Sequence, residues 1–257
     1  MDKYRRQLTK KEEPHSPGEE EHIVKMWTPL HFCTPVGYDY FPKSRLFITV
    51  NFLLRQLVYV VGPVIFKVFF GLHVVHGDRL KTLPQKGVTV CNHVHMLDCG
   101  VVACHMGRRR ICIPTLESNF CIPGIRWLVR LLGGIPLPGK VQPFRQMNEA
   151  LTDYINKGHL VHVYPEGILY PRYNGIRTFK RGAFSLAYEC NVPVIPYVIR
   201  YVEPEGLERI FHRKKVMRLY ILDPVYPDTK KNKKEETLRL CDEVRRKMEE
   251  VFTKNNP

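Results

Sequence analysis

A histidine and an aspartate five positions apart, His93 and Asp98, are the side chains in this sequence best suited to acid–base chemistry. They follow the compact apolar run 87–91, which is typical of a buried strand. If the chain turns into a helix there, Asp98 can reach back to one imidazole nitrogen of His93 and fix its tautomer. The other nitrogen can then accept a proton. The spacing therefore predicts a general base that needs no covalent nucleophile.

Two later loops carry groups suited to holding a phosphate. The first follows a short strand expected at 134–137, and its predicted substrate-binding residues are Gly134 and Lys140, which offer backbone amides and an ammonium. The second follows a strand expected at 159–164, and its predicted substrate-binding residues are Glu166, Gly167, Arg172, Arg177 and Lys180. The cations of this loop can hold a phosphate while Glu166 orients one of them or a substrate hydroxyl. A solvated basic loop is the alternative interpretation.

These loops need a sheet to position them. Short apolar runs alternate with longer amphipathic segments after residue 75, which predicts an α/β fold with a single mixed sheet flanked by helices. Further strands are expected at 110–114, 192–200 and 216–221, and helices at 97–106, 124–132, 144–156, 181–189 and 234–252. The prolines of strand 192–200 suggest that it lies at an edge of the sheet or forms a wall of the substrate site.

The sequence divides into four regions. An N-terminal extension (1–45) is polar at first and then rich in aromatic residues and proline, and its first 25 residues are expected to lie loosely over the surface or to be disordered. Apolar helices (46–75), an α/β domain (76–227) and a C-terminal amphipathic helix (228–257) follow. No apolar leader is found near the N-terminus, so we expect no cleavable secretory signal and a catalytic domain that faces the cytoplasm.

The apolar segment 46–75 is predicted to associate with a membrane as a peripheral or monotopic anchor. Pro63 should break or kink a single helix, so two short helices are expected rather than a clean transmembrane span. Asn51, Arg55 and Tyr59 recur at four-residue spacing, which lets the first helix lie in the membrane interface with these groups outward. Helices packed on the globular core, or a genuine span, are the alternatives.

Charge and cysteine content limit the classes of partner. Forty Lys and Arg against 25 Asp and Glu give a formal net charge of +15, which attracts polyanions such as lipid headgroups. Because no zinc-finger spacing or other nucleic-acid motif is found, no nucleic-acid partner is expected. The eight cysteines are irregularly spaced and are predicted to be buried thiols in a reducing compartment, with Cys91 an inert one.

In their order along the chain, these motifs resemble the glycerolipid acyltransferase family, which includes the 1-acylglycerol-3-phosphate acyltransferases. The resemblance covers about residues 70–205. The residues that match or approximate the family's blocks are Asn92, His93, Asp98, Gly134, Leu137, Lys140, Glu166, Gly167, 179–184 and 192–196. Two departures matter. His95 replaces the usual serine, and Ile168 and Leu169 replace a threonine and the arginine thought to bind the acceptor phosphate.

The resemblance implies an O-acyltransferase of phospholipid biosynthesis. An acyl group would pass from acyl-CoA or acyl-ACP, as co-substrate rather than bound cofactor, to a hydroxyl of a lysophospholipid, 1-acylglycerol-3-phosphate above all. His93 would be the base and Asp98 its support, with no metal. Arg172 or Arg177 would replace the missing arginine, and Arg177 is preferred because it lies close to Phe179 and Lys180.

Two other functions stay open from the residues. His93 and His95 have a spacing that can bind a metal, so a metal-dependent hydrolase is the first alternative, with His159 and His162 as further ligands. Against this, Asp98 lies one position too far along the chain for the usual HxHxD pattern. A non-enzymatic basic membrane-binding module is the second alternative, because the charge and the apolar segment alone would suffice for it.

Overall fold

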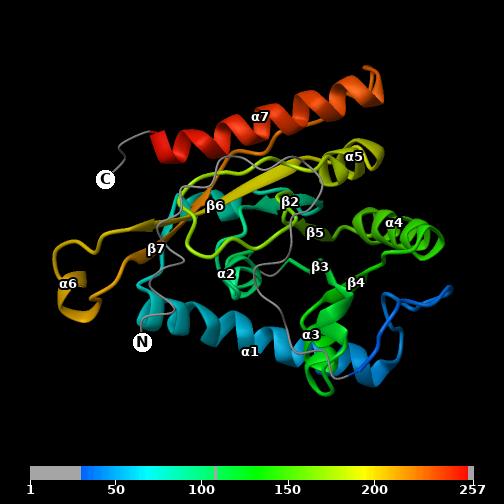
Figure 1. The fold of residues 1–257 in the computed structure, drawn as a ribbon, viewed down its shortest axis with the longest axis horizontal. Helices are drawn as coiled ribbons and strands as arrows, with labels where there is room; N and C mark the ends of the chain where they lie inside the picture. The colour runs from blue at the N-terminus through cyan, green and yellow to red at the C-terminus, as the bar shows by residue number, and fades with distance from the viewer. Residues whose placement is uncertain (1–29, 107–108, 254–257) are drawn as a thin grey trace, which may run out of the picture.

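A mixed seven-stranded sheet lies at the centre of the structure, a computed structural model that describes residues 30–106 and 109–253. The strand order is β1-β7-β6-β2-β5-β3-β4, and within these residues only the β6–β7 pair is antiparallel. Helices cover both faces of this sheet (Figure 1). The predicted α/β fold with one mixed sheet is confirmed.

The strands are β1 His73–Val75, β2 Gly87–Cys91, β3 Ile111–Leu116, β4 Gly134–Leu137, β5 Leu160–Val163, β6 Val194–Val202 and β7 Val216–Ile221. The helices are α1 Arg45–Phe70, α2 Asp98–Cys104, α3 Ile125–Leu131, α4 Val141–Asn156, α5 Gly182–Glu189, α6 Glu208–Phe211 and α7 Lys233–Thr253, with 3₁₀ turns at Gly77–Lys81 and Glu117–Phe120. Sequence periodicity missed β1, α6 and the two 3₁₀ turns, which are too short to show a repeat.

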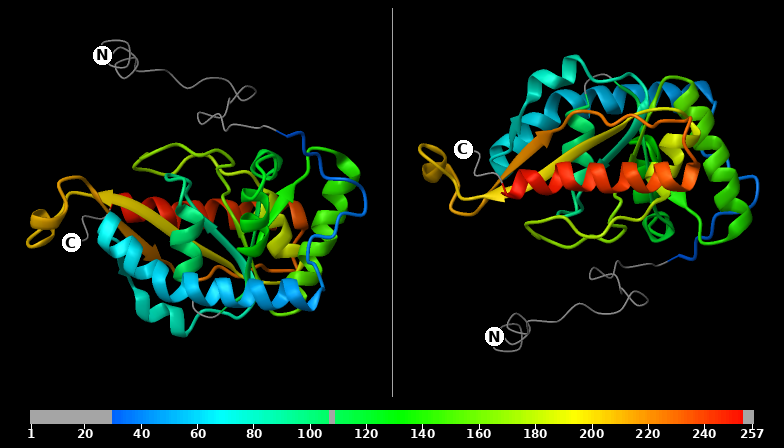
Figure 2. Two further views of the ribbon diagram at one scale, coloured as in Figure 1. Left: turned by 90° about the horizontal axis from the view of Figure 1, so that it is seen from below. Right: turned by 90° about the horizontal axis from the view of Figure 1, so that it is seen from above.

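Two buried clusters, one on each face of the sheet, form the core. One gathers apolar residues of α4, α5 and α7, and the other gathers residues of α1 and α2. Figure 2 shows α1 in front when the ribbon is seen from one side and α7 in front when it is seen from the other. The two faces share strand β6, because Val194 and Val198 belong to the first cluster while Ile195, Tyr197 and Ile199 belong to the second. Burial on both faces explains why this strand is continuously apolar in sequence.

One continuous helix, α1, replaces the two short helices predicted within residues 46–75. Ser44 caps its start by accepting a hydrogen bond from the amide of Phe47, and Pro63 lies inside it. The helix packs on α2 immediately before the proline, where a Cβ added to Gly62 would lie only 2.2 Å from the sulfur of Cys104. We attribute the continuity across Pro63 to this close contact, which outweighs the local effect of the ring.

Most of α1 is not covered by protein. Its buried residues are Gly62 and Phe66 alone, and the helix is long and apolar enough to cross a membrane by length and composition. Its exposed large apolar side chains are Leu46, Ile48, Val50, Phe52, Leu53, Leu57, Tyr59, Val60, Val61, Val64, Ile65, Val68 and Phe69. The alternative that this segment merely packs on the globular core is therefore wrong for most of its surface.

The prediction that strand 192–200 lies at an edge is also wrong. Strand β6 lies inside the sheet, between β2 and β7. Its ladder with the following chain is irregular at Pro196: between the pairs Val194–Val225 and Tyr197–Ile221, β6 has two residues and the partner chain has three. A bulge of this kind tolerates a proline inside a sheet, because the regular donor is not required there.

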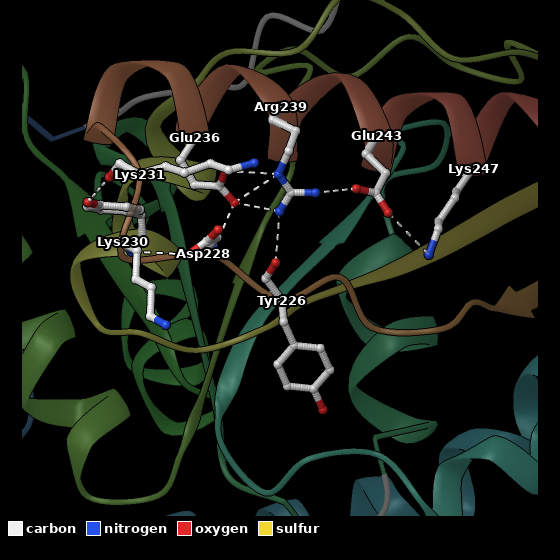
Figure 3. Close-up of polar contacts among 9 residues, drawn as sticks. Tyr226, Asp228, Lys230, Lys231, Glu236, Arg239, Glu243 and Lys247 are labelled. Atoms are coloured by element: carbon white, nitrogen blue, oxygen red, sulfur yellow. Dashed lines mark hydrogen bonds and ion pairs between the residues drawn. The ribbon is translucent and has the colours of Figure 1, made fainter.

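Chain segments from both ends pack on the domain. Residues 30–45 are anchored by ring stacking, for example Phe41 on Tyr154 at 4.4 Å, whereas the prediction for residues 1–25 lies outside the described residues. Helix α7 is braced by Arg239, which contacts Glu236 and Glu243 on the same helix and donates to the carbonyl of Tyr226 at 2.9 Å (Figure 3).

Candidate active site

The residues predicted to react lie where β2 and β5 end. These two strands are parallel neighbours, so their C-terminal ends meet at one edge of the sheet, where open α/β sheets place their reactive side chains. His93 follows β2 and Glu166 follows β5. All five residues of β2 are buried, so the strand that carries His93 is fixed in the middle of the core.

His93 and Asp98 contact each other. The imidazole Nδ1 of His93 lies 3.1 Å from Oδ2 of Asp98, which is the first residue of α2. The Asp98 side chain is fully buried, whereas 23% of the His93 side chain is exposed. A carboxylate on Nδ1 keeps the proton on that nitrogen, so Nε2 is the atom left to accept a proton from a substrate.

The backbone holds Asp98 in place. The same Oδ2 accepts hydrogen bonds from the amides of Val94 at 2.7 Å and His95 at 2.8 Å. The other oxygen, Oδ1, is buried and forms no hydrogen bond within the described residues. Because two fixed amides orient the carboxylate independently of substrate, the histidine–aspartate pair is already assembled in the free protein.

Tyr164 forms the wall behind the imidazole. Its ring stacks on that of His93, with centroids 4.0 Å apart and planes 17° from parallel, and its edge contact with His162 is 4.6 Å. Burial lowers the pKa of His162 to about 3 and raises the pKa of Tyr164, so both are uncharged at neutral pH. Sequence reasoning missed this role of Tyr164, although its position directly after the neighbouring strand was a usable signal.

Asn92 fixes the end of β2. Its side-chain amide donates to the carbonyl of Ile199 and accepts from the amide of Ile199, both at 2.8 Å. The fully buried side chain thus prolongs the pairing of β2 with β6 beyond the last backbone pair, Cys91–Tyr197. The chain therefore leaves the sheet at a defined point immediately before His93.

Glu166 joins the two loops of the site. It is 2% exposed, and its carboxylate accepts from the amide of His93 at 3.3 Å and from that of Arg177 at 3.1 Å. Burial raises the pKa of Glu166, and these two hydrogen bonds oppose the rise. The sequence predicts that this carboxylate orients a cation or a substrate hydroxyl, and that role stays a prediction; in the structure its hydrogen bonds with two backbone amides position the loop.

Two further backbone bonds hold the 164–181 loop against the chain after β2. The amide of Tyr170 donates to the carbonyl of His93 at 2.9 Å, and that of Arg172 donates to Val94 at 2.8 Å. With Glu166, these contacts hold the backbone of the loop beside the segment that carries His93.

The three predicted cations of the loop have different surroundings. The guanidinium of Arg177 lies 5.2 Å from the ring centre of Tyr170 and donates to the carbonyl of Ile168. Arg172 is exposed, and its charge adds to the burial that lowers the pKa of His95. Lys180 lies over Gly167, where an added Cβ would be 2.9 Å from its Nζ. The Gly167 position, with φ of 77°, suits glycine on both counts.

Gly134 and Lys140 lie elsewhere. Gly134 begins the edge strand β4 and exposed Lys140 precedes α4, while β5 and β3 separate β4 from β2. Three strand spacings amount to about 14 Å. Their predicted part in substrate binding remains a prediction, for a substrate long enough to extend along the edge of the sheet.

The groups required by a metal site do not gather in the described residues. Within 30–106 and 109–253, no three His, Cys, Asp or Glu side chains lie close enough together to hold an ion. His95 instead accepts from the amide of Leu97 at 3.1 Å, and His162 is buried against Thr89. The hydrolase alternative, which depends on these histidines as ligands, is not supported by their geometry.

The cysteines are free thiols, as predicted, but not all are buried. Cys33 and Cys99 are exposed. Cys91 is fully buried, and burial raises its pKa, so it is a poor nucleophile despite its place near His93.

Comparisons with known proteins agree with this geometry. A family model described as acyltransferase matches residues 73–200. The 1-acyl-sn-glycerol-3-phosphate acyltransferase BAT2, chloroplastic, of Brassica napus is 32% identical over 179 residues, which cover 66% of this chain and 48% of that protein. The 1-acyl-sn-glycerol-3-phosphate acyltransferase alpha of Bos taurus is 29% identical over 199 residues, which cover 72% and 65%. The chain thus spans about half the length of the chloroplast relatives.

A solved structure shares the fold. The crystal structure of the 1-acyl-sn-glycerophosphate (LPA) acyltransferase, PlsC, from Thermotoga maritima superposes with a TM-score of 0.59 at 21% sequence identity. The match covers 85% of this chain and 87% of that one, so the similarity extends beyond the residues that the family model matches.

Proposed function

The chain belongs to the acyltransferase family, and from this membership we propose that it is an O-acyltransferase of phospholipid biosynthesis. It moves a fatty acyl group from acyl-CoA or acyl-ACP to a hydroxyl of a lysophospholipid, with 1-acylglycerol-3-phosphate as the acceptor. The observation that carries the proposal is the 3.1 Å contact between Nδ1 of His93 and Oδ2 of Asp98 at the end of β2. This pair can deprotonate an alcohol without forming a covalent enzyme intermediate.

The reaction needs one proton to move twice. Nε2 of His93 takes the proton of the acceptor hydroxyl while the oxygen attacks the thioester carbonyl, and Asp98 stabilises the imidazolium that results. The C–S bond then breaks, and the departing thiolate takes the proton back from Nε2. The product is an ester, and the histidine returns to its neutral form.

Arg177 binds the acceptor phosphate in this proposal, with Arg172 and Lys180 of the same loop as further cations. The support is positional: the backbone of the loop is hydrogen-bonded to His93 and Val94, which brings the loop that carries these cations close to the base in the fold. Guanidinium groups suit this task because they present parallel donors to phosphate oxygens. The roles of Gly134 and Lys140 are proposed in the same sense, along the sheet edge.

Membrane association through α1 belongs to the same proposal. The acyl chain and the lysolipid are both amphiphiles, and the exposed apolar side chains of α1 give the protein a surface that can lie in the interface where these substrates reside. The catalytic domain faces the cytoplasm, where the acyl thioesters would be supplied.

The test is an acylation assay on the whole chain. Labelled acyl-CoA and acyl-ACP are incubated with a panel of lysolipids, and we expect labelled product from 1-acylglycerol-3-phosphate. General base catalysis accounts for about a hundred- to ten-thousandfold of rate, so His93→Ala should lower turnover by that factor. His159→Ala is the matched control, because this half-buried histidine precedes β5 at the opposite edge of the sheet. Transfer to no lysolipid, or an undiminished His93→Ala rate, would overturn the proposal.

A further inference from the structure

The turn between β6 and β7 exposes three large apolar side chains that the fold does not use. Short helix α6 lies in this turn, and Leu207, Ile210 and Phe211 are 76%, 71% and 77% exposed. Scattered single apolar residues are normal on a surface, but three so close together at a projecting tip indicate a contact with something other than water.

Cations surround this apolar tip. Arg209, Arg213, Lys214 and Lys215 are all exposed, and only Lys215 has a carboxylate partner in the described residues, the exposed Glu203 at 3.5 Å. Arg209 donates to a backbone carbonyl. Glu203 pairs with Lys215 and Glu208 with Arg218, so Arg209, Arg213 and Lys214 outnumber the one remaining carboxylate of the turn, Glu205. Apolar side chains flanked by an excess of cations are the composition that binds an anionic lipid surface, because the side chains enter the interface while the cations meet the headgroups.

The fold holds the tip firmly beside α1. At its base, Val202 of β6 pairs with Val216 of β7, and Arg218 forms an ion pair with Glu208 of α6 at 2.6 Å. The same guanidinium donates to the carbonyl of Gly71, the residue that caps the C-terminus of α1, at 3.1 Å. Both views place α6 just beyond that end of α1, and α7 lies on the opposite side of the sheet (Figures 1 and 2).

We propose that this turn, residues 203–215, is a second membrane contact that binds the anionic headgroups of a lipid bilayer. The inference rests on the membrane association proposed for α1. A single helix on a surface can rock end to end, and a contact beyond its C-terminal end fixes its tilt. The active-site edge of the sheet is thereby held at a constant angle to the bilayer.

Vesicle binding by the full-length chain tests the proposal. We compare Arg213→Glu/Lys214→Glu with the parent protein on vesicles of phosphatidylcholine alone and of phosphatidylcholine with phosphatidylglycerol. One cation near an anionic surface changes partitioning about fivefold, so the double variant should bind the anionic vesicles at least 25-fold more weakly. Lys230→Glu/Lys234→Glu is the matched control, because these exposed lysines lie beside the start of α7.

A second variant tests the apolar part. Leu207→Ser/Ile210→Ser/Phe211→Ser should lower binding to both kinds of vesicle about tenfold or more, since buried apolar area adds to interfacial affinity. Val141→Ser/Tyr226→Ser, two exposed apolar residues away from α1 and α6, should not. These positions are all exposed, so the variants retain the fold.

The outcomes separate this inference from the proposed function. Acyl transfer measured in detergent micelles reports the chemistry alone. Weaker vesicle binding by the turn variants, relative to their controls, supports the second contact whether or not transfer is found. Binding equal to that of the controls overturns it even if transfer is intact. A tip that serves self-association instead would show as a change of oligomeric state in the serine variant with unchanged vesicle binding.

Discussion

Two buried glutamates, in the active-site loop and at the start of α7, show how differently the molecule treats a carboxylate. Glu166 and Glu236 are 2% and 0% exposed, and each accepts at least one backbone amide. Glu236 also contacts the guanidinium of Arg239, whereas the bonds to Glu166 come from backbone amides. As a result, burial raises the pKa of Glu166, while the hydrogen bonds from Arg239 lower that of Glu236.

This difference distinguishes a carboxylate in the candidate active site from one that only stabilises a helix. At α7 the guanidinium of Arg239 pairs with two carboxylates of its own helix, so it stabilises the helix and does not act on a ligand (Figure 3). At the active site the backbone amides of His93 and Arg177 hold the carboxylate of Glu166.

The largest expected effect on turnover is at Asp98, the carboxylate that contacts the proposed base His93. Asp98→Asn keeps an acceptor for the amides of Val94 and His95 but removes the charge that stabilises the imidazolium. Turnover should fall about a hundredfold or more, with little change in the acceptor KM. Steady-state kinetics and a urea unfolding curve on the same protein check both parts. A loss of stability with unchanged turnover would show that Asp98, like Glu236, only stabilises the fold.

Removal of the cation at α7 should give the opposite pattern. Arg239→Met leaves the carboxylate of Glu236 buried without its ion partner, which costs about 1–3 kcal/mol of unfolding free energy. The acylation rate should stay unchanged, because α7 packs on the face of the sheet that does not carry α2. Arg246→Met, whose ion pair with Glu250 is exposed, is the matched control and should cost little. Equal costs for the two variants would contradict a special role for the buried carboxylate.

A smaller kinetic effect is expected at the loop cations. Arg177→Ala should raise the KM for 1-acylglycerol-3-phosphate about tenfold while kcat changes little, because a charge-assisted contact to phosphate would be lost. Arg172→Ala, measured beside it, decides which arginine replaces the one missing from the family's motif. A fall in kcat without a change in KM would place Arg177 in the chemistry instead.

The smallest expected effect is a difference in how the free energy of unfolding depends on pH. The pKa of Glu166 is raised from 4.5, so its contribution to stability is present below that value and is lost as the pH rises through the folded-state pKa. The pKa of Glu236 is lowered from 4.5, so its contribution is present above that value and is lost as the pH falls. The free energy of unfolding of Glu166→Gln and of Glu236→Gln is measured against that of the parent protein from about pH 3 to about pH 7. The two differences in free energy should change in opposite directions as the pH rises.

Periodicity predicted the sheet and its flanking helices because most of these elements are long enough to repeat a pattern. It failed where tertiary contacts decide the outcome. Pro63 would break an isolated helix, but α1 continues past it, where Gly62 packs closely on Cys104. Pro196 indicated an edge strand, and only the unequal chain lengths opposite it reveal a bulge.

At the site, the sequence could identify reactive groups but not their contacts. His93 and Asp98 were predicted together because they are near in sequence and their chemistry is complementary. The hydrogen bond between Glu166 and the amide of His93 and the stacking of Tyr164 on His93 were not, because they join residues more than 70 positions apart. A carboxylate beside several cations in sequence favours an ion pair, and only the fold shows that it faces backbone amides instead.

The central place of β2 also bears on the order in which the chain assembles. Thr89 of this strand contacts His162, 73 residues further along the chain, and Asn92, immediately after the strand, bonds Ile199, 107 residues further along. The segment that leads into His93 therefore cannot be completed until most of the chain has been synthesised. Such distant pairings fold slowly. The part of α1 before Pro63 emerges earlier and needs only local contacts to form, so this apolar segment can meet a lipid surface while the sheet is still incomplete. Catalytic competence would then arise on the membrane rather than before it.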